Sequence, residues 1–367
     1  MRVLQFIHSL RRGGAERIAV NLLYGLKALG HEVEIATILD VNEYCDDFPE
    51  TKDAKSITTP EKYGWPYSIL KLADGFRRIA ERFSADVVLI HSSTSCIVAA
   101  DSRLTVPTIT VFHGYGDLQR PPSLKATVRK YVDRRAFGKL GGYGVAVSPS
   151  LRSSALIHFG CSEENIRCIY NGIDLVQFPY RACKPKGEPV ICMVGTLAPE
   201  KKVDQAVLAF SCLAKVWPNA CLKIFGEGPF RHQLEKLAED KGLQGSIQFK
   251  GRVSEVASHL GECHILWHLS QREGFGLAVA EAMAVGLPVV GVDAPGTRDI
   301  VRNGETGFLV PADDPEAVAK STALIFADSD RFQQFSKAGR ARVEQLFDNV
   351  RMISNYEKIL KERLNGV

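Results

Sequence analysis

The sequence lacks several features that would assign it to a specialised class of protein. None of its nine cysteines forms a CxxC pair, so the usual zinc-binding spacing is missing, and an odd, scattered set does not suit a disulfide framework. The net charge is only +4, so we expect no nucleic-acid partner. With 24% charged and 45% hydrophobic residues, the chain is not disordered. A globular protein remains, and 367 residues predict two domains.

A long apolar run that could cross a membrane is also missing. The most apolar stretch, residues 274–292, contains Glu281 and a Gly-Leu-Pro interruption, so we expect a buried helix followed by a strand. The first residues, MRVLQFIHSLRRGG, have a short apolar run and no small-residue cleavage site, which predicts a first strand and not a signal peptide. Together with the scattered cysteines, this predicts a cytoplasmic protein.

Short β-rich segments alternate with helical patterns in both halves of the chain, which predicts two α/β domains with parallel sheets. We expect the first domain at 1–178, a proline-containing linker at 179–188 and the second domain at 189–349. The last segment, about 350–367, has a helical pattern and is expected to pack back on the first domain. The expected strands are VLQFIH, EVEIATI, VVLIH, TITVFH and GVAVS in the first half, and VICMVG, CLKIFG, IQFKG, HILWHLS and PVVGV in the second.

Polar residues and glycines follow two expected strands of the first domain. In RRGGAER, Gly13 and Gly14 would let the backbone turn tightly and bring an anion such as phosphate to the N–H groups of the next helix. The motif is neither a GxGxxG fingerprint nor a P-loop, and a plain tight turn is an equally good interpretation of it alone. His113, at the end of TITVFH, could hydrogen-bond a sugar hydroxyl, although a lone histidine there is more often structural.

The second domain carries a pair of glutamates in EGFGLAVAE, at 273–281. Glycines open this loop, and a helix starting near Leu277 would direct its first N–H groups at a ligand. Glu281 lies among Leu, Ala, Val and Met, so its carboxylate needs hydrogen-bond donors, and sugar hydroxyls are such donors. A structural carboxylate bonded to the backbone is the alternative.

A lysine pair follows a strand and a glycine in VGTLAPEKK, at 194–202. A lysine here could reach a diphosphate and neutralise the charge that grows when a phosphate leaves. We favour Lys201, although spacing alone does not separate it from Lys202. Ligands of open α/β sheets bind at the carboxyl ends of strands, where all these features lie, so we expect one phosphate-bearing ligand in a cleft between the domains.

Six motifs are spread along the chain: GGAER, VSPSLR, YNGIDLVQF, VGTLAPEKK, FGEGP and EGFGLAVAEAMAVGLPVVG. Together they resemble the retaining glycosyltransferases of family 4, which have the two-domain, Rossmann-like GT-B fold. The resemblance spans almost the whole chain, and its most specific part is the glutamate pair with the run that follows it. It implies an acceptor-binding first domain, a second domain that binds a UDP- or GDP-sugar, and no required metal or cofactor.

The resemblance also implies roles for individual residues. Glu281 would hold the ribose hydroxyls, and Glu273 would face the transferred sugar. Lys201 matches the family lysine at the diphosphate, and His113 matches the histidine beside the donor sugar, so the expected catalytic residues are Glu273, His113 and Lys201. The further donor contacts are Gly13, Gly14, Phe275, Gly276 and Leu277 at the sugar and diphosphate, and Arg252 and Val253 at the base.

Two positions depart from the family pattern. Thr196 stands where the family often has an arginine, so half of a cationic diphosphate clamp is missing, and Arg12, Lys202 or Arg298 are the candidate replacements. Asp299 stands where a glutamate is more usual, which puts donor-side contacts near the sugar or base in doubt. Thr196 nevertheless remains a candidate donor contact.

The resemblance implies transfer with retained anomeric configuration, in which the acceptor hydroxyl attacks on the face that the diphosphate leaves. Helix N-termini and Lys201 would stabilise the developing charge, and the leaving phosphate oxygen could accept the proton. Glu273 as a covalent nucleophile is the less favoured mechanism. The expected acceptor is a sugar, a lipid-linked sugar or a small molecule, as in cell-surface polysaccharide, glycolipid or glycoconjugate synthesis. A nucleotide-sugar epimerase of the same fold and a non-enzymatic sugar-binding protein are the alternatives.

Residues 123–140 form a local basic segment with a charge of +5, from six basic residues and Asp133. Apolar residues, Val128 and Tyr131 among them, interleave with the charges. Such a helix could rest on an anionic membrane surface or guide an anionic acceptor, and a peripheral location at the inner face of the membrane would follow. A solvated helix face is an equally good interpretation.

Overall fold

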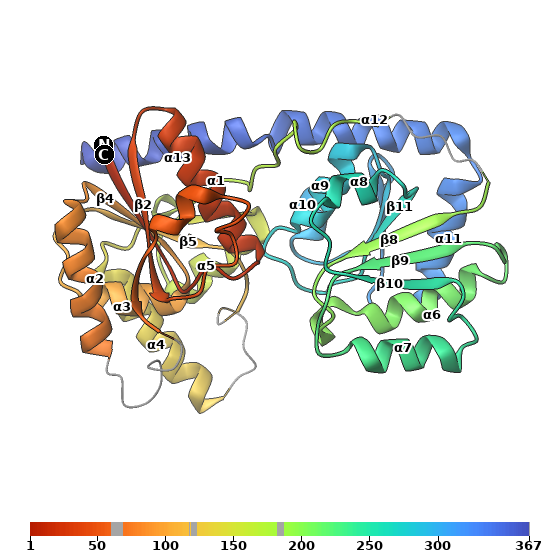
Figure 1. The fold of residues 1–367 in the computed structure, drawn as a ribbon, viewed down its shortest axis with the longest axis horizontal. Coiled ribbons are helices and arrows are strands. Elements are labelled where there is room, and N and C mark those ends of the chain that lie inside the picture. The colour runs from red at the N-terminus through yellow and green to blue at the C-terminus, as the bar shows by residue number, and fades with distance from the viewer. Residues whose placement is uncertain (60–68, 117, 119–122, 182–186, 367) are drawn as a thin grey trace. The chain divides into compact units, whose positions relative to one another are not determined.

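The computed structural model describes residues 1–59, 69–116, 118, 123–181 and 187–366, which form two compact units. Unit 1 consists of Met1–Gly172 and Asn349–Val367, and unit 2 consists of Ile173–Asp348. The chain therefore leaves unit 1 once and returns to it once. Each unit has a parallel sheet with helices packed against it (Figure 1), and the expectation of two α/β domains is confirmed.

The change from unit 1 to unit 2 comes at Gly172, earlier than the boundary that we expected after residue 178. The backbone N–H of Ile173 donates to the carbonyl of Phe347 over 2.7 Å, and that of Arg181 donates to Val285 over 3.0 Å. Residues 173–178, which we expected in the first domain, and residues 179–181, which we expected in the linker, therefore belong to unit 2. Of the expected linker, residues 182–186 lie outside the described residues.

Unit 1 is built, within the described ranges, on a seven-stranded parallel sheet in the order β3-β2-β1-β4-β5-β6-β7. Strands β4 and β5 are buried along their whole length, which is typical of a parallel sheet covered on both faces. The strands are β1 (Arg2–Ile7), β2 (Glu32–Leu39), β3 (Lys55–Thr58), β4 (Val87–His91), β5 (Thr108–Phe112), β6 (Gly144–Ala146) and β7 (Ile166–Cys168).

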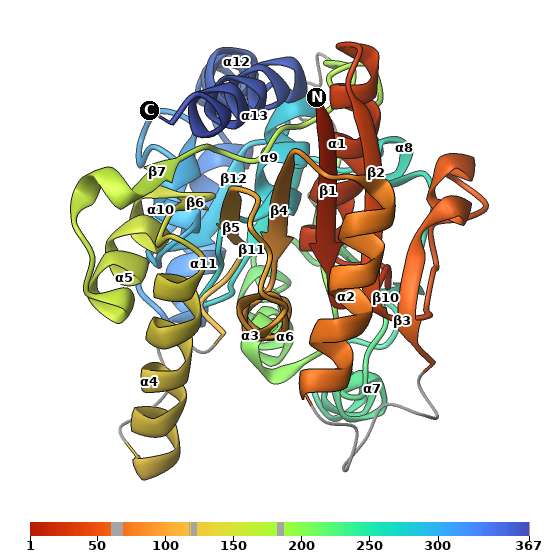
Figure 2. The ribbon, with the colours of Figure 1, turned by 90° about the vertical axis from the view of Figure 1, so that its left-hand side faces the viewer.

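Serine side chains cap three helices of unit 1. Ser92, Ser123 and Ser148 each accept a hydrogen bond from the backbone N–H three residues later, which satisfies one of the free donors of the first turn. The last helix, α13, packs against α1, where His31 Nε2 lies 3.0 Å from Glu357 Oε1. The helices are α1 (Gly14–Ala28), α2 (Ile69–Phe83), α3 (Ser93–Asp101), α4 (Leu124–Lys139), α5 (Pro149–Phe159) and α13 (Asn349–Leu364). Figure 2 shows α4 extending beyond the sheet of unit 1.

Unit 2 has a six-stranded parallel sheet, counted over the described part of the chain, in the order β10-β9-β8-β11-β12-β13. The apolar stretch 274–292 contains a buried helix and a strand, as predicted. The strands are β8 (Val190–Val194), β9 (Cys221–Phe225), β10 (Ile247–Gly251), β11 (Ile265–His268), β12 (Val289–Val292) and β13 (Gly307–Val310). The helices are α6 (Val203–Leu213), α7 (Arg231–Asp240), α8 (Val256–Leu260), α9 (Leu277–Val285), α10 (Thr297–Ile300), α11 (Pro315–Phe326) and α12 (Ser329–Leu346).

Among the helices that the structure describes, none has both the length and the apolar character needed to cross a bilayer.

Candidate active site

The strand order of unit 2 reverses between β8 and β11. Successive strands run outward from β8 through β9 to β10 on one side, and from β11 through β12 to β13 on the other. Ligands of open α/β sheets bind outside the carboxyl ends of the strands at such a switch point. Lys201 follows β8 and Glu273 follows β11, so each side of the switch point supplies one predicted site residue.

Three glycines with positive φ end the strands on one side of this switch point. Gly195, Gly226 and Gly251 have φ values of 155°, 148° and 70°. The N–H of Gly226 donates to the carbonyl of Gly251 over 2.8 Å, and a Cβ on Gly226 would lie 1.8 Å from the carbonyl oxygen of Gly195. The three turns therefore pack backbone to backbone, and a side chain at Gly226 would force them apart.

The two lysines that follow β8 have different partners. A 3₁₀ turn, Pro199–Lys201, places the Lys201 ammonium against Glu273, and its Nζ donates to Glu273 Oε1. Lys202 adopts a left-handed conformation with φ 52°, and its Nζ donates to Asp313 Oδ1 over 3.1 Å. The structure thus separates two lysines that spacing could not, and it brings Lys201 and Glu273 together as predicted site residues.

A buried histidine adjoins this ion pair. His268 Nε2 lies 3.5 Å from Glu273 Oε1, and the side chains are 6% and 15% exposed. Burial lowers the pKa of His268 to about 4, so it is neutral at neutral pH. Burial alone would raise the pKa of Glu273, but attraction to the Lys201 ammonium and hydrogen bonds from Lys201 and Ser270 lower it below its ordinary value. The group therefore consists of an ammonium, a carboxylate and a neutral imidazole.

His268 was not identified from the sequence, where HILWHLS counted only as a strand. It is the last residue of β11, and the carboxyl end of a parallel strand is the place from which His113 was selected in the first domain. Applying the same criterion to every expected strand would have found it.

Helix α9 is buried except along one narrow, half-buried face. It begins after Gly276, whose φ of 102° favours glycine, and six of its nine residues are buried. The three half-buried residues are Leu277, Ala278 and Glu281, which one helical turn places on the same side. Glu281 therefore lies in line with the first turn of α9, whose N–H groups have no partner within the helix.

The loop before α9 is held by close backbone packing. Phe275 is 2% exposed and its ring meets Phe347 edge-on, with centroids 5.3 Å apart, so its ring is not available to a ligand. A Cβ on Gly296, which has φ 86°, would lie 2.2 Å from the carbonyl oxygen of Glu273. Asp299, the unusual aspartate, accepts a hydrogen bond from the Gly296 N–H over 3.3 Å, so it stabilises the turn that supports Glu273.

The remaining residues predicted on the donor side follow strands β8 and β10. Thr196 is exposed after β8, and Arg252 and Val253 follow β10, two strands away from β8 in the sheet. The three cations considered as replacements for an arginine at Thr196 all pair with carboxylates. These pairs are Lys202 with Asp313, Arg298 with Asp293 and Arg12 with Asp47.

Unit 1 has a pocket of about 260 Å³ at the carboxyl ends of β1, β4 and β5. His113 lines it and lies 2.9 Å from His91, measured from Nε2 to Nδ1. Burial lowers the pKa of His113 to about 4 and that of His91 well below its ordinary value, so both rings are neutral. Glu16 and Asp133 also line this pocket.

The glycine loop that we predicted as an anion site is covered by a carboxylate of the chain. Gly13 precedes α1, and the Tyr44 hydroxyl donates to its carbonyl oxygen over 3.1 Å. A Cβ on Gly13 would lie 2.4 Å from Glu16 Oε2, because the Glu16 side chain folds over this glycine. Burial raises the pKa of Glu16. An anion near Gly14 would therefore meet a carboxyl group as well as helix N–H groups.

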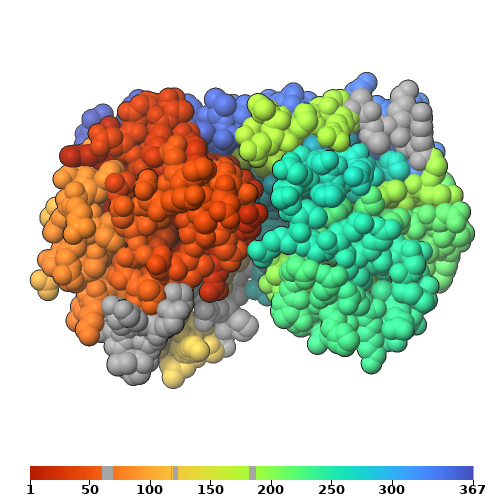
Figure 3. Space-filling view, viewed as in Figure 1, coloured from red at the N-terminus to blue at the C-terminus, as the bar shows by residue number. Residues whose placement is uncertain are grey.

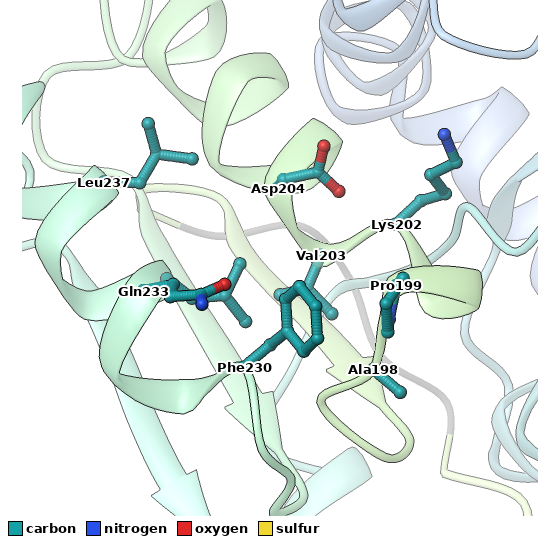
Figure 4. Close-up of a pocket in the computed structure, with 9 residues that line it drawn as sticks. Ala198, Pro199, Lys202, Val203, Asp204, Phe230, Gln233 and Leu237 are labelled. Atoms are coloured by element: carbon teal, nitrogen blue, oxygen red, sulfur yellow. The ribbon is translucent and has the colours of Figure 1, made fainter.

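A hollow in unit 2 lies beside the Pro199–Lys201 turn and has a volume of about 310 Å³. Figure 4 shows Phe230 and Val203 among its apolar side chains, with Lys202, Asp204 and Gln233 around them. Neither Lys201 nor Glu273 lines this hollow, so it is distinct from the switch-point group.

Two family models match the chain, one in each half. The family model described as Glycosyltransferase Family 4 matches residues 12–177, and the model described as Glycosyl transferases group 1 matches residues 180–342. The two matches together span most of the chain. The chain belongs to the family 4 glycosyltransferases, and it is a glycosyltransferase enzyme. The family resemblance predicted from its motifs is confirmed.

Two of its relatives match more than three quarters of the chain. It is 25% identical over 322 residues to N-acetyl-alpha-D-glucosaminyl L-malate synthase of Bacillus anthracis, with 82% of each chain covered. It is 28% identical over 301 residues to the putative colanic acid biosynthesis glycosyltransferase WcaL of Salmonella typhimurium, covering 78% of this chain and 73% of that one.

Solved structures share the fold over the full length. Anabaena Alr3699/HepE in complex with UDP superposes with a TM-score of 0.84 at 19% identity, covering 99% of this chain and 100% of that one. The same Anabaena protein in complex with UDP-glucose gives a TM-score of 0.82 at 20% identity, with 100% of each chain covered. The two Rossmann-like units therefore have the GT-B fold, as predicted.

Proposed function

We propose that the protein transfers a sugar from a nucleotide-sugar to an acceptor hydroxyl, with retention of configuration and without a metal ion or other cofactor. The observation that carries this proposal is the group of Lys201, Glu273 and His268 at the switch point of unit 2. It combines one ammonium with a carboxylate and lies at the strand ends where a ligand of this fold is expected.

Each component of the group has a role in this reaction. Departure of the diphosphate leaves negative charge, which the Lys201 ammonium and the first N–H groups of α9 stabilise electrostatically. Glu273 holds Lys201 before the donor binds and then faces the transferred sugar. The leaving phosphate oxygen accepts the proton of the acceptor hydroxyl, so no protein base is needed.

The donor is bound by unit 2, with Glu281 at the ribose and Arg252 and Val253 at the base. We infer a UDP-sugar as the first donor to test, because the Anabaena protein of the same fold is in complex with UDP and with UDP-glucose. A GDP-sugar is the second. Unit 1 binds the acceptor, which we place in cell-surface polysaccharide or glycoconjugate synthesis, since one relative bears a colanic acid name. A cytoplasmic location stays a prediction.

The test of this function is incubation of the protein with UDP-glucose, UDP-N-acetylglucosamine and GDP-mannose in water. We expect slow release of nucleoside diphosphate from one donor, and NMR spectra should show the anomer of the donor in the first sugar formed. A sugar of opposite configuration would exclude retention. Formation of an epimeric nucleotide-sugar would instead indicate an epimerase, and unchanged donors would favour a sugar-binding protein.

Two glutamate variants test the assignment of roles. Glu281→Ala should weaken UDP binding about tenfold, because two hydrogen bonds to ribose hydroxyls are lost. Glu273→Gln should leave UDP affinity within about threefold and lower turnover about 100-fold, because it removes charge near the reacting centre. Calorimetric titration with UDP and initial rates of UDP release measure the two effects. Equal losses of UDP affinity in both variants would contradict these roles.

We also propose that α4 contacts an anionic membrane surface. Leu124, Val128 and Tyr131 are 82%, 55% and 66% exposed and follow one another at helical spacing, so they form an apolar stripe along the outer face of α4. The yellow atoms of this helix lie at the lower margin of unit 1 in Figure 3. Lys125, Lys130 and Arg135 flank the stripe and form no ion pair with any described residue. This combination suits the boundary between head groups and acyl chains.

The membrane contact predicts an effect of removing the stripe. Serine at Leu124, Val128 and Tyr131 should reduce binding to vesicles containing phosphatidylglycerol at least about tenfold, because the buried apolar area is lost. Raising the salt concentration should weaken wild-type binding, since each basic residue near the surface contributes about 1 kcal/mol.

The control for this experiment replaces two exposed valines of unit 2, Val176 and Val216, with serine. Co-sedimentation with vesicles measures binding. If wild-type binding does not depend on anionic lipid or salt, or if the control variant loses as much vesicle binding, α4 has no such role.

A further inference from the structure

A chain of hydrogen bonds links three strands of unit 1 behind its pocket. Gln5 lies in β1, His91 ends β4, and His113 follows β5. Gln5 Oε1 lies 3.0 Å from His91 Nε2, and His91 Nδ1 lies 2.9 Å from His113 Nε2. Gln5 and His91 are fully buried, so water does not compete for these contacts.

The amide of Gln5 fixes the direction of this chain. Its Nε2 donates to the carbonyl oxygen of Ala19 over 2.9 Å. Turning the amide around would place Oε1 against that carbonyl, with two acceptors facing each other. Oε1 therefore faces His91 and can only accept, so His91 must carry its proton on Nε2.

The proton on His91 in turn determines the tautomer of His113. A neutral imidazole has one N–H, and burial keeps His91 neutral by lowering its pKa. Its Nδ1 is then an acceptor, and His113 Nε2 must be the donor. His113 is neutral too, so its Nδ1 bears a lone pair. This Nδ1 is buried, and no described residue hydrogen-bonds to it.

We propose that Gln5 and His91 are positioning residues that hold His113 in its Nε2–H tautomer, so that Nδ1 accepts a hydrogen bond from a substrate hydroxyl. This inference rests on the proposed glycosyl transfer for its substrate. An unprotonated Nδ1 accepts a hydrogen bond from a donor such as a sugar hydroxyl. An ionised phosphate or carboxylate oxygen has no proton to donate, so Nδ1 favours a neutral, hydroxyl-bearing part of the substrate.

The near-isosteric variant Gln5→Met tests the role of the amide. Methionine removes the acceptor oxygen at the start of the hydrogen-bond chain, so His91 can carry its proton on Nδ1 instead of Nε2. His113 Nε2 then need not be the donor between the two rings. We expect a mixed or reversed tautomer of His113 and a fall in the rate of UDP release of roughly 10- to 100-fold, as for other residues that orient an imidazole. Thr37→Val is the matched control, because Thr37 is a buried polar residue of the neighbouring strand β2 and does not belong to the Gln5–His91–His113 hydrogen-bond chain.

The tautomer is read directly from ¹H–¹⁵N spectra of the histidine rings, which distinguish a protonated from an unprotonated nitrogen. We expect Nε2–H for His91 and His113 in the wild-type protein, whether or not UDP-glucose is a substrate. Protonation of His113 at Nδ1 in the wild type would overturn the proposal even if Gln5→Met does not fold. An unchanged tautomer in Gln5→Met, or an equal rate loss in Thr37→Val, would overturn it as well.

Discussion

Replacing Lys201 with methionine should lower kcat/KM for the nucleotide-sugar by about 100- to 1,000-fold. This corresponds to about 3–4 kcal/mol of transition-state stabilisation, the range found for a single preorganised electrostatic contact. The expectation follows from the position of its ammonium, which contacts Glu273 at the switch point between β8 and β11. Charge that develops on the leaving diphosphate would meet no other side-chain cation of this group.

The neighbouring lysine is the matched control. Lys202→Met should change kcat/KM less than about threefold, because Lys202 pairs with Asp313, whose side chain is 53% exposed, and such surface pairs contribute little. Initial rates of UDP release at several donor concentrations measure both variants. Equal losses of kcat/KM in the two variants would show that contact with Glu273 does not distinguish the catalytic lysine from its neighbour.

The Lys201 variant also leaves a carboxylate without its ammonium. Glu273 is only 15% exposed, so Lys201→Met should cost about 1–3 kcal/mol in the free energy of unfolding. The double variant Lys201→Met/Glu273→Gln should recover most of this stability and none of the activity. Urea unfolding of the two variants therefore separates the structural effect from the catalytic one.

Gly226→Ala should destabilise unit 2 by at least about 3 kcal/mol. The new Cβ would lie 1.8 Å from the carbonyl oxygen of Gly195, and the φ of 148° is one that side chains rarely adopt. Because backbone and not a flexible side chain is in the way, the strand ends of β8 and β9 would have to separate. Activity should fall with stability, since Lys201 follows the turn at Gly195.

The control for this prediction is Gly245→Ala. A Cβ there meets no atom within 4 Å, and the φ of Gly245 is not positive, so stability should change by less than about 1 kcal/mol. Thermal or urea unfolding measures both variants. Similar unfolding free energies for the two would show that the turn at Gly226 relaxes at little cost.

The sequence predicted all the central strands, because they are apolar and buried on both faces. The three that it missed, β3, β7 and β13, lie at the edges of their sheets. These strands have three or four residues, and β3 and β7 include exposed positions, so their apolar signal is short and mixed.

The domain boundary was placed too late for a related reason. The bond between Ile173 and Phe347 joins residues far apart in the chain, and no local pattern shows it.

The site was predicted where strand ends and motifs coincide, as at Lys201 and Glu273. We favoured Lys201, but spacing alone could not separate it from Lys202. Their different partners depend on the left-handed conformation of Lys202, which is uncommon for residues other than glycine and is not evident from the sequence. Glu16 covering Gly13 was missed for a similar reason. The motif shows a glycine before a helix but not which way the next acidic side chain folds.

The division of unit 1 into two chain segments has a consequence for its biosynthesis. The ribosome makes residues 1–172 first, but α1 must wait for α13, whose Ile353 packs against Gly25. Unit 2 is one continuous segment, and it is translated during that wait. The face of α1 around Gly25 therefore stays uncovered in the nascent chain until α13 is made, and this is the interval in which a chaperone would have most to protect.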